Sequence, residues 1–79
     1  MKFSVTVTLK KDVLDPQGKV VQNTLVNIGI KNLKSIRQGK YFEIEVDESE
    51  LLTAEKIVDK MCKKLLVNLV IEDYKINKI

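Results

Sequence analysis

Strict alternation of apolar and polar side chains near the N-terminus constrains the fold more than any other feature. One side of the extended chain carries apolar side chains at Phe3, Val5, Val7 and Leu9, and hydroxyl side chains lie between them. A strand of this kind buries one face and leaves the other open. Residues 2–10 are therefore expected to form a half-buried strand of a sheet.

Two segments have the pattern of helices. Asp15 suits an N-cap and Pro16 the first helical position, while Gly29 suits a C-cap. These signals predict a first helix over about 16–28. The second segment has a helical stripe of apolar side chains at Ala54, Val58, Met61 and Leu65. This stripe predicts a second helix over about 50–65.

The remaining segments favour strands. Residues 32–37 and 40–46 are predicted to form two strands joined by a tight turn at Gln38-Gly39. Residues 69–76 are rich in β-forming side chains and are predicted to form the last strand. The order βαββαβ predicts an α+β, ferredoxin-like two-layer sandwich, with a four-stranded antiparallel sheet and both helices on one face.

The length of the chain suits a single domain over residues 1–79, and a domain of this size has a thin core. Cys62 is the only cysteine, so no internal disulfide is possible, and without histidine the chain has too few soft ligands for a structural zinc site. Self-association is the remaining source of stability, and we expect a homodimer or tetramer that forms through the sheet. Tyr41 and Tyr74 are expected to add aromatic area to the open sheet face.

The inventory of reactive side chains argues against catalysis by this chain alone. Without histidine there is no group for proton transfer near neutral pH, and the serines lack an evident base. Glu72 and Asp73 are adjacent on a predicted strand, so they point to opposite faces and cannot share a metal ion. Cys62 lies in the apolar stripe, where a buried and inert thiol is expected. We therefore expect no catalytic residue, metal or cofactor in this chain.

Charge and hydropathy argue against two classes of partner. The formal net charge is +3, and the lysines are spread along the chain and interleaved with acidic residues. Arg37 is the only arginine, whereas a nucleic-acid footprint is clustered and richer in arginine. The apolar runs are far shorter than a membrane span. A lone thiol and no export signal predict a cytoplasmic location.

Two cations flank the predicted turn at Arg37-Gln38-Gly39-Lys40. The guanidinium of Arg37 offers a bidentate fork that lysine lacks. The pattern is equally compatible with a solvated hairpin tip and with a contact to an anion or a partner.

Four ordered blocks of the sequence stand out: KDVLDPQG at 11–18, the leucine-to-glycine helix end at 25–29, IRQGK at 36–40, and LLVN with VIEDY at 65–68 and 70–74. Together, in this order and spacing, they resemble the PurS family, the small subunit of phosphoribosylformylglycinamidine (FGAM) synthase. The family usually has a proline after the Asn of the last block, where this chain has Leu69. Proline would fix the entry into the last strand and remove one backbone donor.

The resemblance implies a non-catalytic subunit in purine biosynthesis, typically a dimer, which bridges a glutaminase and a large synthetase and assists ammonia transfer between them. ATP and Mg are then expected in the large subunit. The implied subunit contacts are Asp15, Pro16, Gln17, Gly18, Arg37, Gly39, Lys40, Asn68, Glu72, Asp73 and Tyr74. The main alternative is a small-molecule-sensing regulatory module of βαββαβ type, which ligand-dependent thermal stabilisation would reveal.

Overall fold

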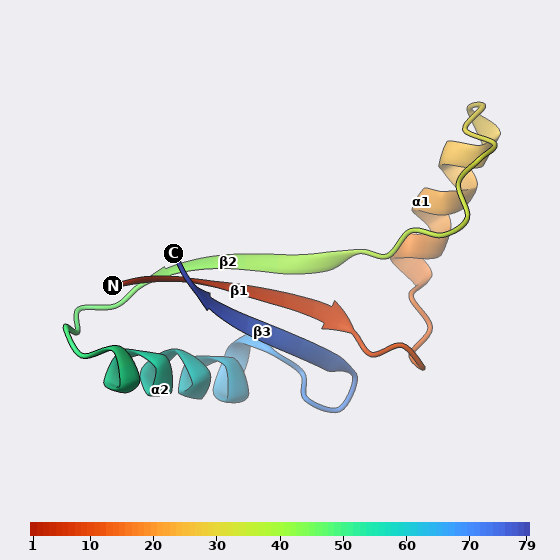
Figure 1. Cartoon of the computed structure of the whole chain (residues 1–79). Helices are drawn as coiled ribbons and strands as arrows, with labels where there is room; N and C mark the ends of the chain where they lie inside the picture. The colour runs from red at the N-terminus through yellow and green to blue at the C-terminus, as the bar shows by residue number, and fades with distance from the viewer.

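A three-stranded antiparallel sheet forms the centre of the computed structural model, which describes all 79 residues. The elements in chain order are β1 (Lys2–Leu9), α1 (Pro16–Asn27), β2 (Gly39–Glu45), α2 (Leu51–Met61), a π-helical turn η1 (Cys62–Leu66) and β3 (Glu72–Lys78). The strand order is β2-β1-β3, and β1 pairs antiparallel with both neighbours (Figure 1). The predicted α+β class and the antiparallel sheet are confirmed.

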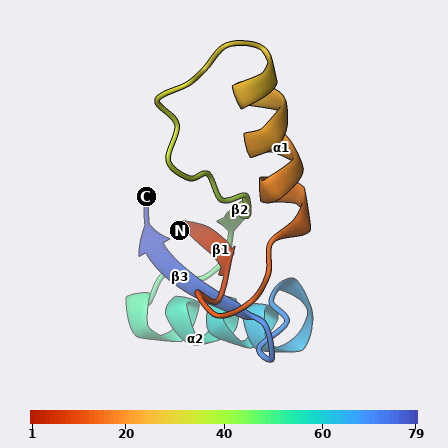
Figure 2. The same ribbon diagram turned by 90° about the vertical axis from the view of Figure 1, so that its right-hand side faces the viewer.

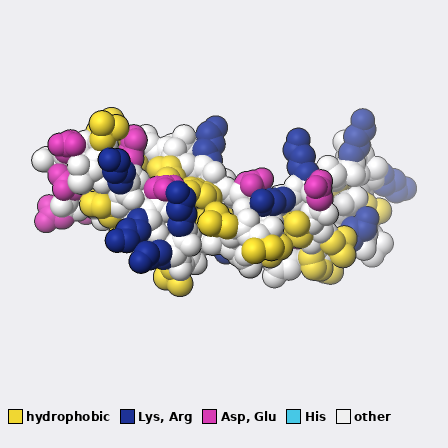
Figure 3. All heavy atoms as spheres, turned by 90° about the horizontal axis from the view of Figure 1, so that it is seen from below, with side chains coloured by type: hydrophobic (Ala, Val, Ile, Leu, Met, Phe, Trp, Pro, Cys, Tyr) yellow, Lys and Arg dark blue, Asp and Glu magenta, His cyan; other side chains and the backbone are white.

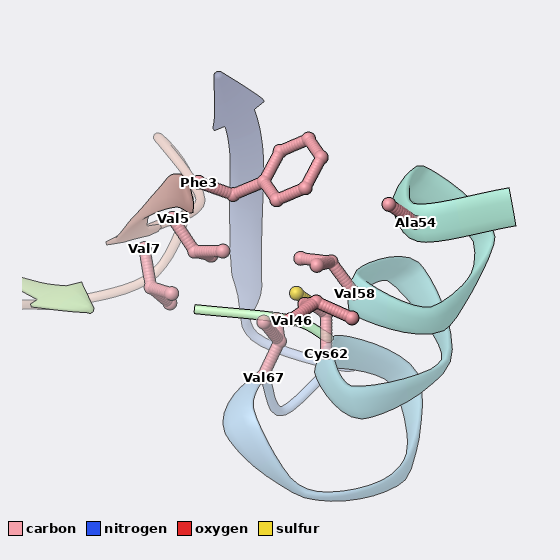
Figure 4. Packing of buried hydrophobic residues seen from close by; sticks show 8 residues of the cluster. All are labelled: Phe3, Val5, Val7, Val46, Ala54, Val58, Cys62 and Val67. Atoms are coloured by element: carbon pink, nitrogen blue, oxygen red, sulfur yellow. The ribbon is translucent and has the colours of Figure 1, made fainter. Parts of the chain in front are cut away.

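The apolar core lies between one face of the sheet and α2. The alternation in β1 has the expected effect, because Phe3, Val5 and Val7 are completely buried on this inner face. Figure 4 shows them pointing toward side chains of α2 and its flanks, and the whole buried cluster is Phe3, Val5, Val7, Val46, Ala54, Val58, Cys62 and Val67. The outer face is polar, and β1 there places Thr6 between Tyr41 of β2 and Lys75 of β3.

The second helix changes geometry about one turn before its predicted end. It is α-helical from Leu51 to Met61 and then widens into η1, which ends with the Val67 N–H donating to the carbonyl of Cys62 (3.0 Å). The wider turn lets Cys62 and Val67 both face the core. The expected burial of Cys62 is confirmed, and burial raises the pKa of its thiol, with the nearby Asp59 carboxylate adding to the shift.

Helix α1 forms as predicted but does not cover the sheet. Figures 1 and 2 show α1 and the segment that returns beside it standing away from the sheet and from α2. No residue of the core, and none packed against its rim, comes from residues 8–41. We call residues 12–38 the arm. The prediction that both helices lie on one face is therefore wrong for a single chain, because the apolar pattern of α1 did not specify which surface it meets.

The predicted strand at 32–37 is absent, and the hairpin at Gln38-Gly39 does not form. Residues 33–38 run beside α1, where the Gln22 side chain donates to the carbonyl of Lys34 (3.3 Å), and the chain then continues straight into β2. Without a hairpin the segment has no partner strand, so the sheet has three strands in place of four. The last strand begins at Glu72, since residues 69–71 form a turn instead of the predicted strand start.

Candidate functional site

The root of the arm brings three of the four sequence blocks together. Asp15 is the N-cap of α1, with one carboxylate oxygen accepting from the Gly18 N–H (2.9 Å). The other oxygen accepts from the Gln38 N–H (3.1 Å), 23 residues further along the chain. Pro16 occupies the first turn, where its missing N–H leaves no donor unpaired. One carboxylate therefore fastens the start of α1 to the chain that enters β2.

Arg37 ties the same region to the end of β1. Its Nη2 donates to the carbonyls of Leu9 (3.1 Å) and Lys10 (3.0 Å). The interpretation of Arg37 as a solvated hairpin tip is thus wrong, since the side chain is bound to its own main chain. The side chain remains exposed, and its part in a subunit contact stays a prediction.

Two glycines allow the chain to pass closely at this root. A Cβ on Gly18 would overlap the Asp15 carboxylate and lie 3.0 Å from the carbonyl oxygen of Ile36. A Cβ on Gly39 would overlap the carbonyl oxygen of Val7 and lie 3.1 Å from the Thr8 methyl. The close backbone approach expected from these glycines is therefore present, and it occurs within the chain.

The C-terminal block joins the site through Glu72. Its carboxylate pairs with Lys40 (3.4 Å) and accepts from the Asn68 N–H (2.7 Å), while the Asn68 side chain accepts from the Val70 N–H (3.1 Å). A hollow of about 310 Å³ lies between the blocks and is lined by Val7, Leu9, Asp15, Gln17, Gln38, Gly39, Lys40 and Glu72. We call this hollow and its walls the junction.

Two of the predicted contact residues lie away from the junction. Asp73 is exposed on the outer sheet face, and Tyr74 lies on the inner face, where its hydroxyl donates to the Asp59 carboxylate. This hydrogen bond raises the pKa of Tyr74 to about 12 and, together with Lys63 (2.9 Å), lowers the pKa of Asp59. The expectation that Tyr74 adds aromatic area to the open face is therefore wrong, while Tyr41 does lie there. Glu72 and Asp73 point to opposite faces, as predicted.

The polar groups of the junction act as a clamp that holds segments of this chain together. Hydrogen bonds from Gly18 and Gln38, followed by the positive charge of Arg37, hold the pKa of Asp15 below its ordinary value. Both carboxylates at the junction already have partners on their own chain. Gln38 and Asp59 were not among the predicted contact residues, because Gln38 acts through its main-chain N–H and Asp59 has no distinguishing pattern in the helix.

Protonation of Asp15 is expected to loosen the arm. Because the folded-state pKa is depressed, the carboxylate stabilises the root above the unfolded pKa, and this contribution is lost as pH falls through the folded value. Hydrogen exchange should therefore show faster exchange at the Gly18 and Gln38 amides in Asp15→Asn at neutral pH. Asp12→Asn, a nearby exposed acid, serves as the control. Equal exchange in the two variants would contradict the clamp.

Comparison with known proteins places the chain in a family. The family model described as PurS, phosphoribosylformylglycinamidine (FGAM) synthase, matches residues 2–79. The FGAM synthase subunit PurS of Bacillus subtilis is 43% identical over 74 residues, which cover 94% of this chain and 87% of the relative. The corresponding subunit of Methanocaldococcus jannaschii is 39% identical over 75 residues, covering 95% of this chain and 90% of the relative.

Solved structures agree with these relatives in fold. The crystal structure of M. jannaschii PurS has a TM-score of 0.85 and 40% identity, covering 99% of this chain and 96% of that one. A chain in the structure of PurLQS from Thermotoga maritima has a TM-score of 0.91 and 33% identity, covering 99% of this chain and 95% of that one.

The fold is that of solved small subunits of a synthase. The chain belongs to the PurS family, and it is a subunit of FGAM synthase, an enzyme of purine biosynthesis. None of its helices combines the length and apolar character needed to cross a lipid bilayer.

Proposed function

We propose that this chain is a non-catalytic bridge in the FGAM synthase complex, where a homodimer joins a glutaminase subunit to a large synthetase subunit in the cytoplasm. In this role it helps ammonia pass from the first active site to the second. ATP and Mg belong to the large subunit, and this chain holds neither. The observation that carries the proposal is the likeness of nearly the whole chain to a PurS chain in the three-component PurLQS structure.

The chemistry of ammonia transfer suits a chain with these residues. Ammonia that reaches bulk water is diluted and protonated, so a bridge has to close a path and exclude water, and needs no general base. Shape and rigidity are what such a piece contributes. The junction supports this reading because its hydrogen bonds and the Lys40–Glu72 ion pair fix the arm, β1, β2 and the turn before β3 relative to each other.

Eight of the predicted contact residues divide into two groups under this proposal. Asp15, Gly18, Gly39 and Glu72 shape the junction from within. Arg37, Lys40, Asn68 and Asp73 are exposed and form the surface that a partner subunit meets.

Reconstitution from the three separate subunits tests the bridge. Without this chain, glutamine-dependent synthesis is expected to fall by about tenfold or more, because free ammonia loses the high effective concentration of a closed path. Synthesis from added ammonium salt should change much less. The measurement is the ratio of the two rates, with and without this chain. An unchanged ratio would overturn the proposal.

A further inference from the structure

The outer edge of β3 has unpaired main-chain groups. Strand β3 lies at one side of the sheet and pairs with β1 alone. The Ile79 N–H donates to the carbonyl of Lys2 (3.0 Å). Because bonded and non-bonded pairs alternate in an antiparallel ladder, the main-chain groups of Tyr74, Ile76 and Lys78 point away from β1, to the open edge. Such a row of N–H and C=O groups is a template for one more strand.

A hollow of about 460 Å³ lies beside this edge, between β3 and α2. Phe3 and Ile76 line it from the sheet, and Leu52 lines it from α2 with 65% of its surface exposed. Pockets that bind ligands have volumes of about 300–1,000 Å³. Figure 3 views the molecule from the side of α2 and shows apolar side chains open to solvent among charged ones. The hollow therefore has room for an apolar side chain from outside the chain.

The charged side chains around the hollow are only partly paired. Asp59 forms an ion pair with Lys63 (2.9 Å). Lys56 and Lys78 have no ion-pair partner within the chain, and neither has Glu55. The rim thus carries two unpaired positive charges and one unpaired negative charge. Charge complementarity favours an acidic group in the molecule that fills the hollow.

We propose that a partner subunit of the synthase adds an extended segment to the open edge of β3. The segment places an apolar side chain in the hollow and an acidic side chain against Lys56 and Lys78. Main-chain hydrogen bonds to the edge then supply affinity, and the hollow selects the side chain, which is how extended peptides bind to sheet edges. The inference rests on the proposed function and names the surface through which one partner is held.

A second copy of β3 fits this edge poorly. From Tyr74 to its end at Lys78, the strand contains no acidic residue and carries two lysines, Lys75 and Lys78. Pairing two such strands edge to edge would leave Lys56 and Lys78 of both copies without a counter-charge, and like charges near each other across a strand pair are destabilising. The edge therefore suits a segment of a different sequence.

The edge is also well separated from the surface at the junction. Strand β3 begins at the junction with Glu72 and ends beside the hollow with Lys78, and its seven residues span about 20 Å. A bridge has to hold two partners at the same time. A partner at the hollow and another at the exposed residues around the junction would not compete for the same surface.

Amide exchange in the assembled complex tests the added strand. In the free chain the Lys75 and Asn77 amides, which bond to β1, should exchange slowly, whereas the Ile76 and Lys78 amides should exchange fast because they have no acceptor. Assembly with the glutaminase and synthetase subunits is expected to slow Ile76 and Lys78 by about tenfold or more. Exchange is quenched and read residue by residue by NMR. An assembled complex in which both amides still exchange fast would overturn the inference and leave the bridge standing.

Lys78→Pro and Lys78→Ala form a matched pair of variants. Proline removes the outward N–H and places its ring at the edge, but it keeps the ladder to β1, because this N–H faces solvent on an edge strand. Alanine keeps the N–H. We expect the Kd for one of the two partner subunits to be about tenfold higher for Lys78→Pro than for Lys78→Ala. Equal Kd values for both partners would overturn the inference.

Lys56→Gln tests the acidic side chain of the segment and does not alter the strand. Loss of this charge at an exposed rim should raise the same Kd about two- to fivefold. Lys11→Gln, at an exposed lysine in the loop after β1, makes the same change of charge and should leave that Kd unaltered. Equal Kd values for the two variants would contradict the acidic contact. Failure of the bridging role would appear separately, as reconstituted rates that are the same with and without this chain.

Discussion

Phe3→Ala is expected to leave a large fraction of the protein molecules unfolded at 25 °C. Phe3 is completely buried, and it is the largest side chain in a core of eight residues. Removing a buried phenyl ring costs about 3–5 kcal/mol through lost transfer free energy and the cavity left behind. Small domains have a total free energy of unfolding of about 5–15 kcal/mol, and short chains lie at the low end. Urea denaturation followed by circular dichroism would measure the loss.

The matched control is an aromatic residue on the other face of the same sheet. Tyr41 is 60% exposed, so Tyr41→Ala should change the free energy of unfolding by about 0.5 kcal/mol or less. Both variants are measured at the same protein concentration, because association would stabilise the folded state by mass action. Similar losses for Phe3→Ala and Tyr41→Ala would contradict the one-sided core.

Local sequence patterns predicted those strands and helices that form through contacts between neighbouring residues. The alternation around Val5 and Val7 predicted a strand over 2–10, and β1 is Lys2–Leu9. The cap signals at Asp15 and Pro16 predicted the start of α1, because the capping hydrogen bond to Gly18 forms within four residues. Such contacts depend only on neighbours in the chain, so they can be read without knowledge of the tertiary structure.

Placement of the arm could not be predicted from the same patterns. Residues 32–37 were assigned to a strand because Gln38-Gly39 is a good turn sequence, yet the chain passes straight through it into β2. Whether a hairpin closes or opens depends on which surface α1 covers. The apolar pattern of α1 does not indicate which surface that is. In the same way, Asn68 forms a local turn with Val70, which delays the last strand to Glu72.

The sequence predicted which residues belong to the site, but not how they are arranged in space. Three blocks resembling the PurS family proved to lie around one junction, although each was recognised separately. Arg37 was expected to meet a partner or solvent, and its acceptors are main-chain carbonyls at Leu9 and Lys10 that no sequence pattern marks. The distant contact from Asp15 to Gln38 also uses a main-chain N–H, which every residue but proline offers.

Gly39→Ala is expected to weaken the β1–β2 pairing. Its expected loss of stability is second only to that of Phe3→Ala. Gly39 is paired with Thr8 in the ladder, and an added Cβ would overlap the Val7 carbonyl oxygen. That oxygen belongs to the backbone of the central strand, so it cannot move away as a side chain could. Inserting a methyl group into such a site costs about 1–3 kcal/mol. Urea denaturation should show the loss, and amides of β2 should exchange faster.

Gly29→Ala isolates the contact from the general effect of replacing a glycine. Both substitutions restrict the unfolded chain to the same extent. Gly29 has φ +110° and nothing within 4 Å of its added Cβ, so its variant is strained only in its own backbone, at the tip of the arm. Amide exchange in β2 should therefore stay slow in Gly29→Ala and accelerate in Gly39→Ala. If the β1–β2 amides are equally protected from exchange in both variants, the close approach at Gly39 does not constrain the sheet. Gly39 would then not be a structural part of the junction.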